Sequence, residues 1–544
     1  MNLKERERLG RQMTRTPPSP SPSLPALASV LADQTAVPVK APRRRLAVPA
    51  RWYSLPLALF AALCLVLVGT GRLDEKVVSN LSSSGDRLLA LTPVLTQPPD
   101  NMIARPLPAP YNCSSMTNYY IEQNGGSDSY DGRADVWDGT HGPWKTISHA
   151  NSVLSGGAKC VNVGPGMYTG EIYTAKSGSG DTPTGYFVWR SRKPHQAILQ
   201  EPAHPRNNAV FFCDTCKYVV LDGFTINGNL DGFEQGIAFF GTYGGHHIKI
   251  LNNVVANMGD HGIDVYAVAD TTDRRNPYGY DYVTIAGNVV HDVGQSGVDP
   301  GASDGIVTFH QVTLDSHPGF HTTIYNNIVY NVAYPRHPTQ KTENHCIMLD
   351  DLGGQHIPYT SSVLVENNLL YNCSGNGISV YGQFNSLIRN NTLYANCRSA
   401  DLGYACGEIE VVMYNGQGAT IVNNIADTAG LTTRHGHFAL VECTRSGADT
   451  NRWYNNLTFN GTTGQPSVGY VCGGTQTPIT TAHGNIFGQN PQFHNPSGYD
   501  FTLQSTSPAI GAGTSLYPGD PFVDSINLTG VRRPQGKSCN IGAY

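Results

Sequence analysis

Five short apolar segments between residues 261 and 412 align with one another, and the first three place histidine or aspartate at one matching position. Each segment has a central isoleucine, and the residues two positions before it are His261, Asp304, His345, Asn376 and Gly407. The residue directly after the first of these isoleucines is Asp264. Imidazoles and carboxylates exchange protons near neutral pH, so a surface that gathers them could perform general acid–base catalysis. His261, Asp264, Asp304 and His345 are therefore candidate catalytic residues.

Aromatic rings, cations and further carboxylates lie near the ends of the same segments. Rings stack on sugars, cations pair with the carboxylates of acidic sugars, and carboxylates placed close together can hold Ca²⁺. The set predicts a site for a neutral or acidic polysaccharide, with Ca²⁺ as the candidate cofactor. The candidates are Tyr266, Tyr381, Arg336 and His310 for substrate binding, Lys341 as a catalytic base, and Asp350 and Asp351 as metal ligands.

Two reactions and one non-catalytic function fit this set. In elimination from a uronate polymer, the reaction we prefer here, Lys341 or Arg336 removes the proton next to the sugar carboxyl. In inverting hydrolysis, Asp264 would stand about 6.5–9.5 Å from Asp304 or Asp350, one carboxyl protonating the leaving oxygen and the other activating water. A glycan-binding or structural surface protein would need the rings without converging acid–base groups. Asp and His near turns also commonly bond only to backbone groups.

A repeat of short strands must position these residues. Eight apolar runs end in asparagine, at Asn253, Asn288, Asn327, Asn368, Asn391, Asn424, Asn456 and Asn485, with steps of 23 to 41 residues. The apolar period near two predicts strands, and the 59 glycines suit the turns between them. A chain that coils so that each strand pairs with its counterpart one turn later places matching positions about 4.8 Å apart. The asparagines are then expected to form a structural ladder of side-chain amides.

Two stretches carry a resemblance to a known family. NGGSDSYDG at 124–132 and GAKCVNVGPGMYTG at 157–170 resemble the entry of pectate-lyase-like β-helix proteins, and SPAIGAGTS at 507–515 resembles their closing segment. The resemblance implies an all-β fold, a right-handed parallel β-helix, with a short capping helix after the first loop. That scaffold carries lyases, hydrolases, epimerases and non-catalytic surface proteins. The chain lacks the N-T-D, G-H-G and R-I-K series of the polygalacturonases and the D-P-H motif of the alginate epimerases.

The N-terminal region has a different composition. Residues 1–51 are rich in Pro, Ser and basic residues and are expected to be a disordered cytoplasmic tail. Residues 52–71 have no charge and predict a single transmembrane signal-anchor helix, with a cleaved signal peptide as the alternative. Residues 72–116 read as a linker, and 117–544 as the β-helix domain. The positive-inside rule places that domain outside the membrane, in the periplasm or at the cell surface.

The net charge and the cysteines indicate which partners to expect and whether disulfides form. A formal net charge of −5 without a basic patch argues against nucleic-acid binding, so the expected partners are a polysaccharide and the membrane, with the protein a monomer. Twelve cysteines in an exported chain predict disulfides. The nearest candidate pairs are Cys213 with Cys216, Cys397 with Cys406, and Cys443 with Cys472. Eleven cysteines lie outside the apolar segment, so one must remain free or pair elsewhere.

Overall fold

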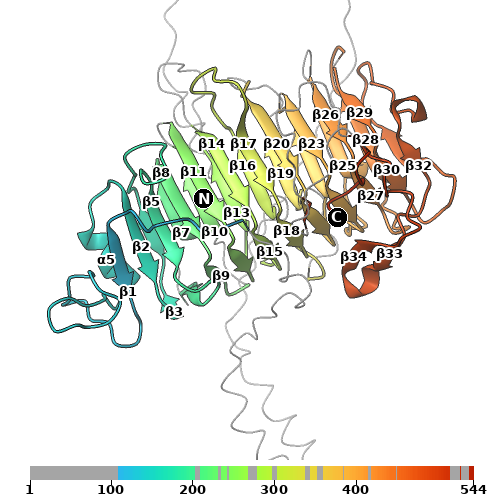
Figure 1. The fold of residues 1–544 in the computed structure, drawn as a ribbon. Helices are drawn as coiled ribbons and strands as arrows, with labels where there is room; N and C mark the ends of the chain where they lie inside the picture. Colours follow the sequence, from blue (N-terminus) through green and yellow to red (C-terminus); the bar gives the residue numbers. More distant parts are fainter. Residues whose placement is uncertain are drawn as a thin grey trace, which may run out of the picture. The chain divides into compact units, whose positions relative to one another are not determined.

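The computed structural model describes residues 108–544, apart from 203–208, 231–234, 242–243, 268–278, 297–302, 337–342, 352–358, 384, 415–417, 449, 515–526 and 529–537. In these residues the chain runs repeatedly through three parallel sheets, which we call A, B and C. Each strand pairs in parallel with the strand one coil before it and the strand one coil after it, as the pairs β11–β14, β12–β15 and β13–β16 show. Figure 1 shows the coils following one another from β1 to β32 along the stack. The predicted parallel β-helix is confirmed.

The three sheets contain 11, 11 and 10 strands. Sheet A consists of β1 (Asn118–Ile121), β2 (Lys159–Val163), β5 (Phe187–Ser191), β8 (Lys217–Asp222), β11 (Gly245–Leu251), β14 (Tyr280–Ala286), β17 (Phe320–Tyr325), β20 (Ser362–Glu366), β23 (Ser386–Arg389), β26 (Ala419–Val422) and β29 (Arg452–Tyr454). Sheet B consists of β3 (Gly166–Thr169), β6 (Ala197–Gln200), β9 (Thr225–Asn227), β12 (Val254–Ala256), β15 (Val289–His291), β18 (Ile328–Tyr330), β21 (Leu369–Tyr371), β24 (Thr392–Tyr394), β27 (Ile425–Asp427), β30 (Leu457–Phe459) and β32 (Ile486–Phe487). Sheet C consists of β4 (Ile172–Thr174), β7 (Ala209–Asp214), β10 (Gln235–Phe240), β13 (Ile263–Tyr266), β16 (Ile306–Phe309), β19 (Ile347–Asp350), β22 (Ile378–Tyr381), β25 (Cys406–Met413), β28 (His437–Thr444) and β31 (Val468–Tyr470).

The core lies between the sheets and is built from stacked aliphatic side chains. Alternate residues of each strand point inward, so the same apolar residue type recurs on successive coils. Ile250, Ile285 and Ile324 stack in sheet A, Val255, Val290 and Val329 in sheet B, and Ile263, Ile306 and Ile347 in sheet C, all buried in one cluster. The isoleucines used to align the five segments are therefore core residues. Because side chains alternate along a strand, the residues on either side of each isoleucine point to the outer face of sheet C.

The asparagine ladder is confirmed as a structural element. From Asn288 onward, the Oδ1 of each ladder asparagine accepts the backbone N–H of the ladder asparagine one coil earlier, as Asn327 does from Asn288 at 2.9 Å, and the series continues to Asn485. The Oδ1 of Asn253 accepts from the backbone N–H of Phe224. Each side-chain amide also donates to the next ladder asparagine and to a backbone carbonyl. The residue before most ladder positions is in the left-handed region, such as Asn326 at φ 55° and Gly287 at φ 70°. Asparagine and glycine tolerate this conformation, which explains the recurring Asn-Asn pairs.

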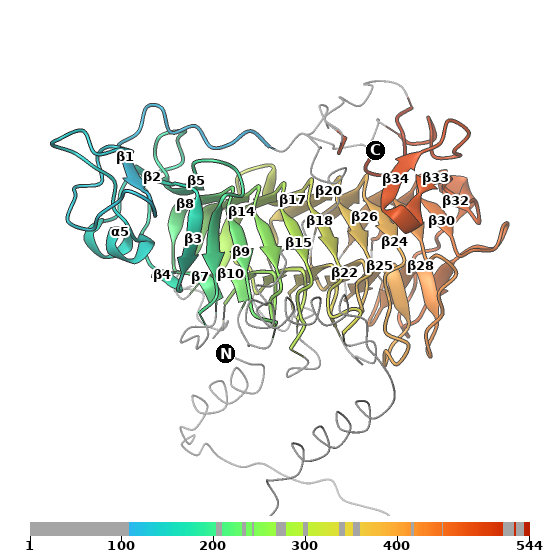
Figure 2. The same cartoon turned by 90° about the horizontal axis from the view of Figure 1, so that it is seen from below.

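A helix covers the N-terminal end of the coil, and a strand pair packs on the side of sheet B. Helix α5 (Ile147–Val153) buries Ile147 and Ala150, and its N-cap Thr146 accepts from the backbone N–H of His149. This is the short capping helix that the resemblance implied. The antiparallel strands β33 (Phe493–Asn495) and β34 (Asp500–Leu503) pack Phe493 and Phe501 against rings of β24 and β21 in sheet B. Figure 2, turned by 90° from Figure 1, shows this pair beside β30 and β32. Two 3₁₀ turns, Thr481–His483 and Pro496–Gly498, complete this region.

Five disulfides join the described residues. The three predicted pairs, Cys213–Cys216, Cys397–Cys406 and Cys443–Cys472, are confirmed. Two further bonds, Cys113–Cys160 and Cys346–Cys373, link residues 47 and 27 positions apart. Among the described cysteines, the buried Cys539 is the one outside these five disulfides.

The N-terminal predictions fall mostly on residues that the structure leaves undescribed. The predicted tail (1–51) and membrane helix (52–71) both lie outside the described residues. Within the described ranges, no helix has the length and apolar character needed to cross a bilayer. Residues 108–116, at the end of the predicted linker, pack on sheet A: the Tyr111 N–H donates to Asp222 Oδ2 at 2.7 Å, and Cys113 is bonded to Cys160.

Candidate active site on the outer face of sheet C

The aligned polar residues form a second ladder at the start of the sheet C strands. The backbone N–H of Asp304 donates to His261 Nδ1 at 2.8 Å, and the N–H of His345 donates to Asp304 Oδ1 at 2.7 Å. The N–H of Asn376 then donates to His345 Nδ1, and the N–H of Gly407 to Asn376 Oδ1, both at 2.9 Å. The structure therefore brings His261, Asp304 and His345 together on consecutive coils. All three are at most 6% exposed.

This ladder determines which protonation states its histidines can use. Because Nδ1 of His345 accepts the backbone N–H of Asn376, this ring carries its proton on Nε2. Burial lowers the pKa of His345 to about 3. A buried neutral imidazole whose Nδ1 is occupied is poorly suited to deliver a proton near neutral pH. The geometry gives these two histidines a structural role, the role in which turn residues satisfy backbone groups.

Neighbouring carboxyl groups on this face raise the pKa of Asp304. The pKa of Asp304 is raised well above its usual value, first by burial and then by the charge of Glu343, with smaller contributions from Asp350 and Asp264. The hydrogen bond from His345 lowers this pKa only in part. Asp264 Oδ2 accepts from Gln235 Nε2 at 2.9 Å. Asp264 and Asp350, predicted from the sequence in one group with Asp304, therefore each lie within electrostatic reach of Asp304.

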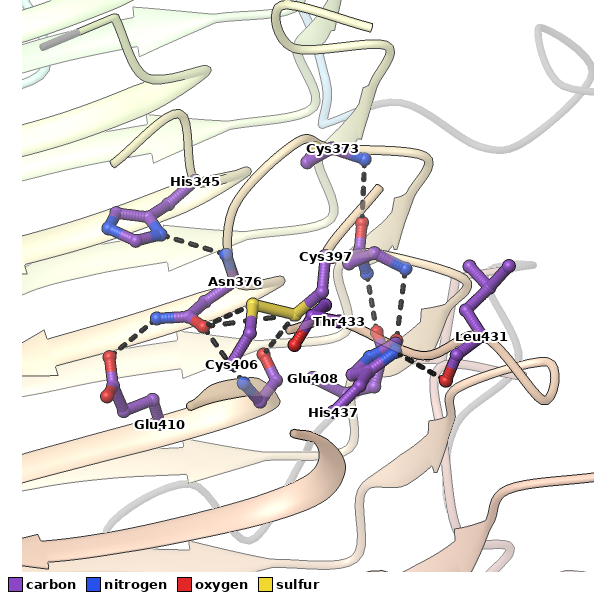
Figure 3. Close-up of a disulfide and its surroundings, with 12 residues drawn as sticks. His345, Cys373, Asn376, Cys397, Cys406, Glu408, Glu410, Leu431, Thr433 and His437 are labelled. Atoms are coloured by element: carbon purple, nitrogen blue, oxygen red, sulfur yellow. Dashed lines mark hydrogen bonds and ion pairs between the residues drawn. A yellow bond between two sulfur atoms is a disulfide. The ribbon is translucent and has the colours of Figure 1, made fainter. Parts of the chain in front are cut away.

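Glu410 is a site residue that the sequence argument did not select. It lies on β25, and its Oε2 accepts from Asn376 Nδ2 at 2.6 Å and from Ser379 Oγ at 3.4 Å. Burial raises the pKa of Glu410 to about 7, whereas the two hydrogen bonds and the charge of Arg445 act to lower it. Figure 3 shows the ladder residue His345 bonded to Asn376, and Asn376 bonded in turn to Glu410. Glu410 occupies the same aligned position as Asp264, which was the available clue.

Tyr381 stands between Asp350 and the strand that carries Glu410. In the strand register Asp350 pairs with Tyr381, and Tyr381 pairs with Val412. Tyr381 is half-buried, its hydroxyl accepts from Tyr414 at 3.0 Å, and the guanidinium of Arg445 lies 5.8 Å from its ring centroid. This part of the outer face thus combines two carboxyl groups, a ring and a cation. Tyr414 and Arg445 follow the strand ends and were not recognised in the sequence.

Asp350 and Asp351 are the predicted ligands of a calcium site. Asp351 is 1% exposed and accepts the Tyr359 N–H through Oδ2, and burial, then the charge of Asp350, raises its pKa to about 7. Its Oδ1 is buried without a hydrogen-bond partner. Among the described residues, no three His, Cys, Asp or Glu side chains converge as a metal site. Ca²⁺ takes six to eight oxygen ligands, so these two carboxyls do not fit a calcium site on their own.

The remaining predicted residues are distributed around this face. Tyr266 is buried and its ring packs 5.0 Å from that of Phe240. His310 is buried at the end of β16, with Nδ1 3.1 Å from the carbonyl oxygen of Ala267. Arg336 is exposed and contacts the carbonyl of Leu230 at 3.5 Å. Lys341 lies outside the described residues.

Comparison with known proteins addresses the fold. A family model described as a right-handed beta helix region matches residues 242–494. Among solved structures, the pectate lyase Pel9A covers 78% of this chain and 96% of its own, at 14% identity and a TM-score of 0.45. XylC in complex with xylose covers 78% and 98%, at 11% identity and a TM-score of 0.44. An alginate lyase from Paenibacillus covers 60% and 97%, at 16% identity and a TM-score of 0.36.

These structural likenesses are too distant to carry an argument about activity. No curated protein matches the chain. The strand pairing and the matching family model agree on the architecture. The chain is therefore a right-handed parallel β-helix protein, as the resemblance implied.

Proposed function

We propose that this chain acts on a polysaccharide along the outer face of sheet C, and that the reaction is hydrolysis of a glycosidic bond. Glu410 is the proton donor and Asp350 is the base that activates water. The observation that carries this proposal is the pairing of a buried carboxyl of raised pKa with a half-buried carboxyl two strands away on the same face.

Glu410 meets the requirements of a general acid. A donor works best when its pKa lies near the working pH, because the group is then both protonated and able to release its proton. Burial brings the pKa of Glu410 to about 7, and Asn376 and Ser379 fix its carboxyl group. These contacts come from the adjacent strand β22 and its preceding turn, which are rigid parts of the coil.

Asp350 is the candidate base on the same face. Strands β19 and β25 are separated only by β22, and Asp350 is in register with Val412, two residues after Glu410, so the two Cα atoms lie roughly 12 Å apart and the side chains must extend toward each other. Inverting enzymes keep their two carboxyls about 6.5–9.5 Å apart so that water fits between carboxylate and sugar. The half-buried ring of Tyr381 lies between the two strands and offers a surface for a sugar ring.

Elimination from a uronate polymer is less well supported by the described residues. That reaction needs cations to neutralise the sugar carboxylate and a base of lowered pKa. The cation found beside Glu410 in the described part of the chain is Arg445, whereas the charged groups that act on Asp304 are the carboxyls of Glu343, Asp350 and Asp264. The described residues do not form a site for Ca²⁺.

The proposal can be tested by product chemistry. Purified full-length protein is incubated with a panel of neutral and uronate polysaccharides, with and without Ca²⁺. We expect new reducing ends without the ultraviolet absorbance of an unsaturated uronate. Unsaturated products would establish elimination instead, and binding without any new chain ends would identify a non-catalytic glycan-binding protein.

We also propose that the β-helix domain works in an oxidising compartment outside the cytoplasm. Five disulfides in the described residues support this location, since such bonds rarely persist in a reducing cytosol. A membrane-anchored domain of this kind would meet its polysaccharide at the cell surface or in the periplasm. Protease treatment of intact cells, followed by detection of the domain, distinguishes an exposed location from an internal one.

A further inference from the structure

A partly open cavity lies at the N-terminal end of the coil, away from Glu410. Its volume is about 410 Å³, within the range of cavities that hold small ligands. The start of helix α5, the turn between β3 and β4, and strand β6 form its walls. In Figure 2, α5, β3 and β4 lie together at the end of the stack where β1 begins.

The floor of the cavity is apolar. Four residues of the buried core line it: Ile147, Tyr168, Ile172 and Leu199. Met167 also lines the cavity and is 45% exposed, so it lies at the mouth. Val153 and Tyr173, which are exposed as well, belong to α5 and β4, two of the elements that border the cavity. Exposed apolar side chains concentrated around a cavity indicate a binding site.

Polar side chains complete the lining. They are Lys145, Ser148, Thr169 and Glu171. The first three are exposed and Glu171 is half-buried. With one basic and one acidic residue, the lining does not favour a ligand of either charge. An apolar floor with hydroxyls at the rim suits a sugar residue, which has apolar C–H faces and hydroxyls that both donate and accept.

Tyr173 relates the cavity to the proposed reaction site. It directly follows Ile172, and strand by strand its register leads to Glu410, so the two residues occupy equivalent positions on the outer face of sheet C. Strand β4 lies seven strands from β25, which separates the two residues by roughly 34 Å. The Tyr173 ring stacks on that of Phe212 on the next coil, with centroids 5.0 Å apart. The face that carries Glu410 therefore continues to the border of the cavity.

We propose that this cavity is a second glycan-binding site, which holds an uncharged sugar residue of a polysaccharide while another part of the same polymer lies at Glu410. The choice of a glycan rests on the proposed function. The cavity is too far from Glu410 to take part in the reaction, but a polymer held at two places stays bound longer than one held at a single place.

The test is calorimetry on the full chain carrying Glu410→Gln, which binds glycans without cleaving them. The probes are cellohexaose, xylohexaose and mannohexaose, with hexagalacturonate as the charged comparison. At least one neutral probe should bind, and more tightly than hexagalacturonate. Adding Ser148→Ala and Thr169→Val removes two rim hydroxyls with little change of shape and should raise the Kd at the cavity by roughly tenfold. Both residues are exposed, so Tm should not change.

A second readout locates the bound glycan. A diazirine derivative of the neutral probe should label peptides that contain residues 145–148 and 167–172, and the two rim substitutions should reduce that labelling. The control pair is Thr463→Val with Ser505→Ala, which removes two exposed hydroxyls following β30 and β34 and should leave every Kd unchanged.

The outcomes separate this inference from the proposed function. If the rim substitutions change neither Kd nor labelling while the wild type cleaves a polysaccharide, the cavity is not a glycan site and the proposed function stands. Failure of all three neutral probes to bind, or tighter binding of hexagalacturonate, also overturns the inference. If the rim substitutions weaken binding but the wild type cleaves no polymer, the inference holds and the proposed hydrolysis fails.

Discussion

The side chain of Asn376 connects the polar ladder of sheet C to Glu410. Its Nδ2 donates to Glu410 at 2.6 Å, while its Oδ1 accepts the backbone N–H of Gly407 on the next coil at 2.9 Å. Asn376 thus links two consecutive coils and also orients the Glu410 carboxyl, whose pKa is raised. The chemistry of this face therefore depends on the register of the scaffold beneath it.

Removing the proton donor should abolish turnover without unfolding the protein. Glu410→Gln keeps an acceptor for Asn376 but cannot deliver a proton, so we expect kcat to fall by about 10²–10⁴-fold with an unchanged circular dichroism spectrum. Asp350→Asn should cause a loss of similar size. The matched control is Asp401→Asn, an exposed acid in the neighbouring loop. If Glu410→Gln kept wild-type kcat, another residue would have to be the donor.

The activity should fall as the pH rises above neutrality. Glu410 acts in its protonated form, and its pKa is about 7, so kcat should decline on the alkaline side of that value. The measurement is a pH–rate profile on a neutral polysaccharide. A profile that rises through pH 7 to 9 would instead indicate that a deprotonated group of high pKa is limiting.

The raised pKa of Glu410 also predicts how the stability of the protein depends on pH. Because the pKa of Glu410 is higher in the folded protein than its ordinary value of 4.5, the folded state binds more protons than the unfolded state between these values. The contribution of Glu410 to stability is therefore greatest at low pH and falls by roughly 3 kcal/mol as the pH rises from 4.5 to about 7. Thermal melts of wild type and Glu410→Gln should converge at low pH and separate near neutrality, with the variant the more stable.

Substitutions at His345 separate a structural from a catalytic role. His345→Asn supplies a side-chain acceptor, as Asn376 does one coil later, and should retain both Tm and activity. His345→Ala leaves the backbone N–H of Asn376 unpaired and should cost about 1–3 kcal/mol. Urea unfolding and initial rates provide the two readouts. A folded His345→Asn protein without activity would show that the imidazole takes part in the reaction.

Truncating the asparagine ladder should be more costly. Asn368 is fully buried, accepts the Asn327 N–H, and donates to Asn391 and to the Ile324 carbonyl. Asn368→Ala leaves these buried groups unpaired, so we expect a loss of at least about 2–4 kcal/mol, measured as a fall in Tm. Asn490→Ala, at an exposed position, is the control and should change Tm little. Equal effects of the two substitutions would show that the ladder is dispensable.

The sequence predicted the scaffold better than the site. The ladder asparagines and the aligned isoleucines identified the strands and their register. Asparagine recurs at the same turn of each coil, and isoleucine recurs at the same core position of each strand. The bonds Cys113–Cys160 and Cys346–Cys373 were missed because their partners meet only after the chain has coiled. The side chains of the polar column bond to the backbone of the next coil, which the sequence pattern alone does not reveal. Glu410 was not predicted because the polar residues of the aligned segments gather in the first three of them, whereas Glu410 lies in the fifth.

The constancy of the asparagine corner, against coils that vary from 23 to 41 residues, has an evolutionary consequence. Length changes are absorbed where the chain leaves the sheets, so insertions between strands need not disturb the packing of Ile and Val inside. New loops can therefore be acquired one at a time, and a lineage carrying this scaffold can alter which glycan it recognises while inheriting its stability unchanged.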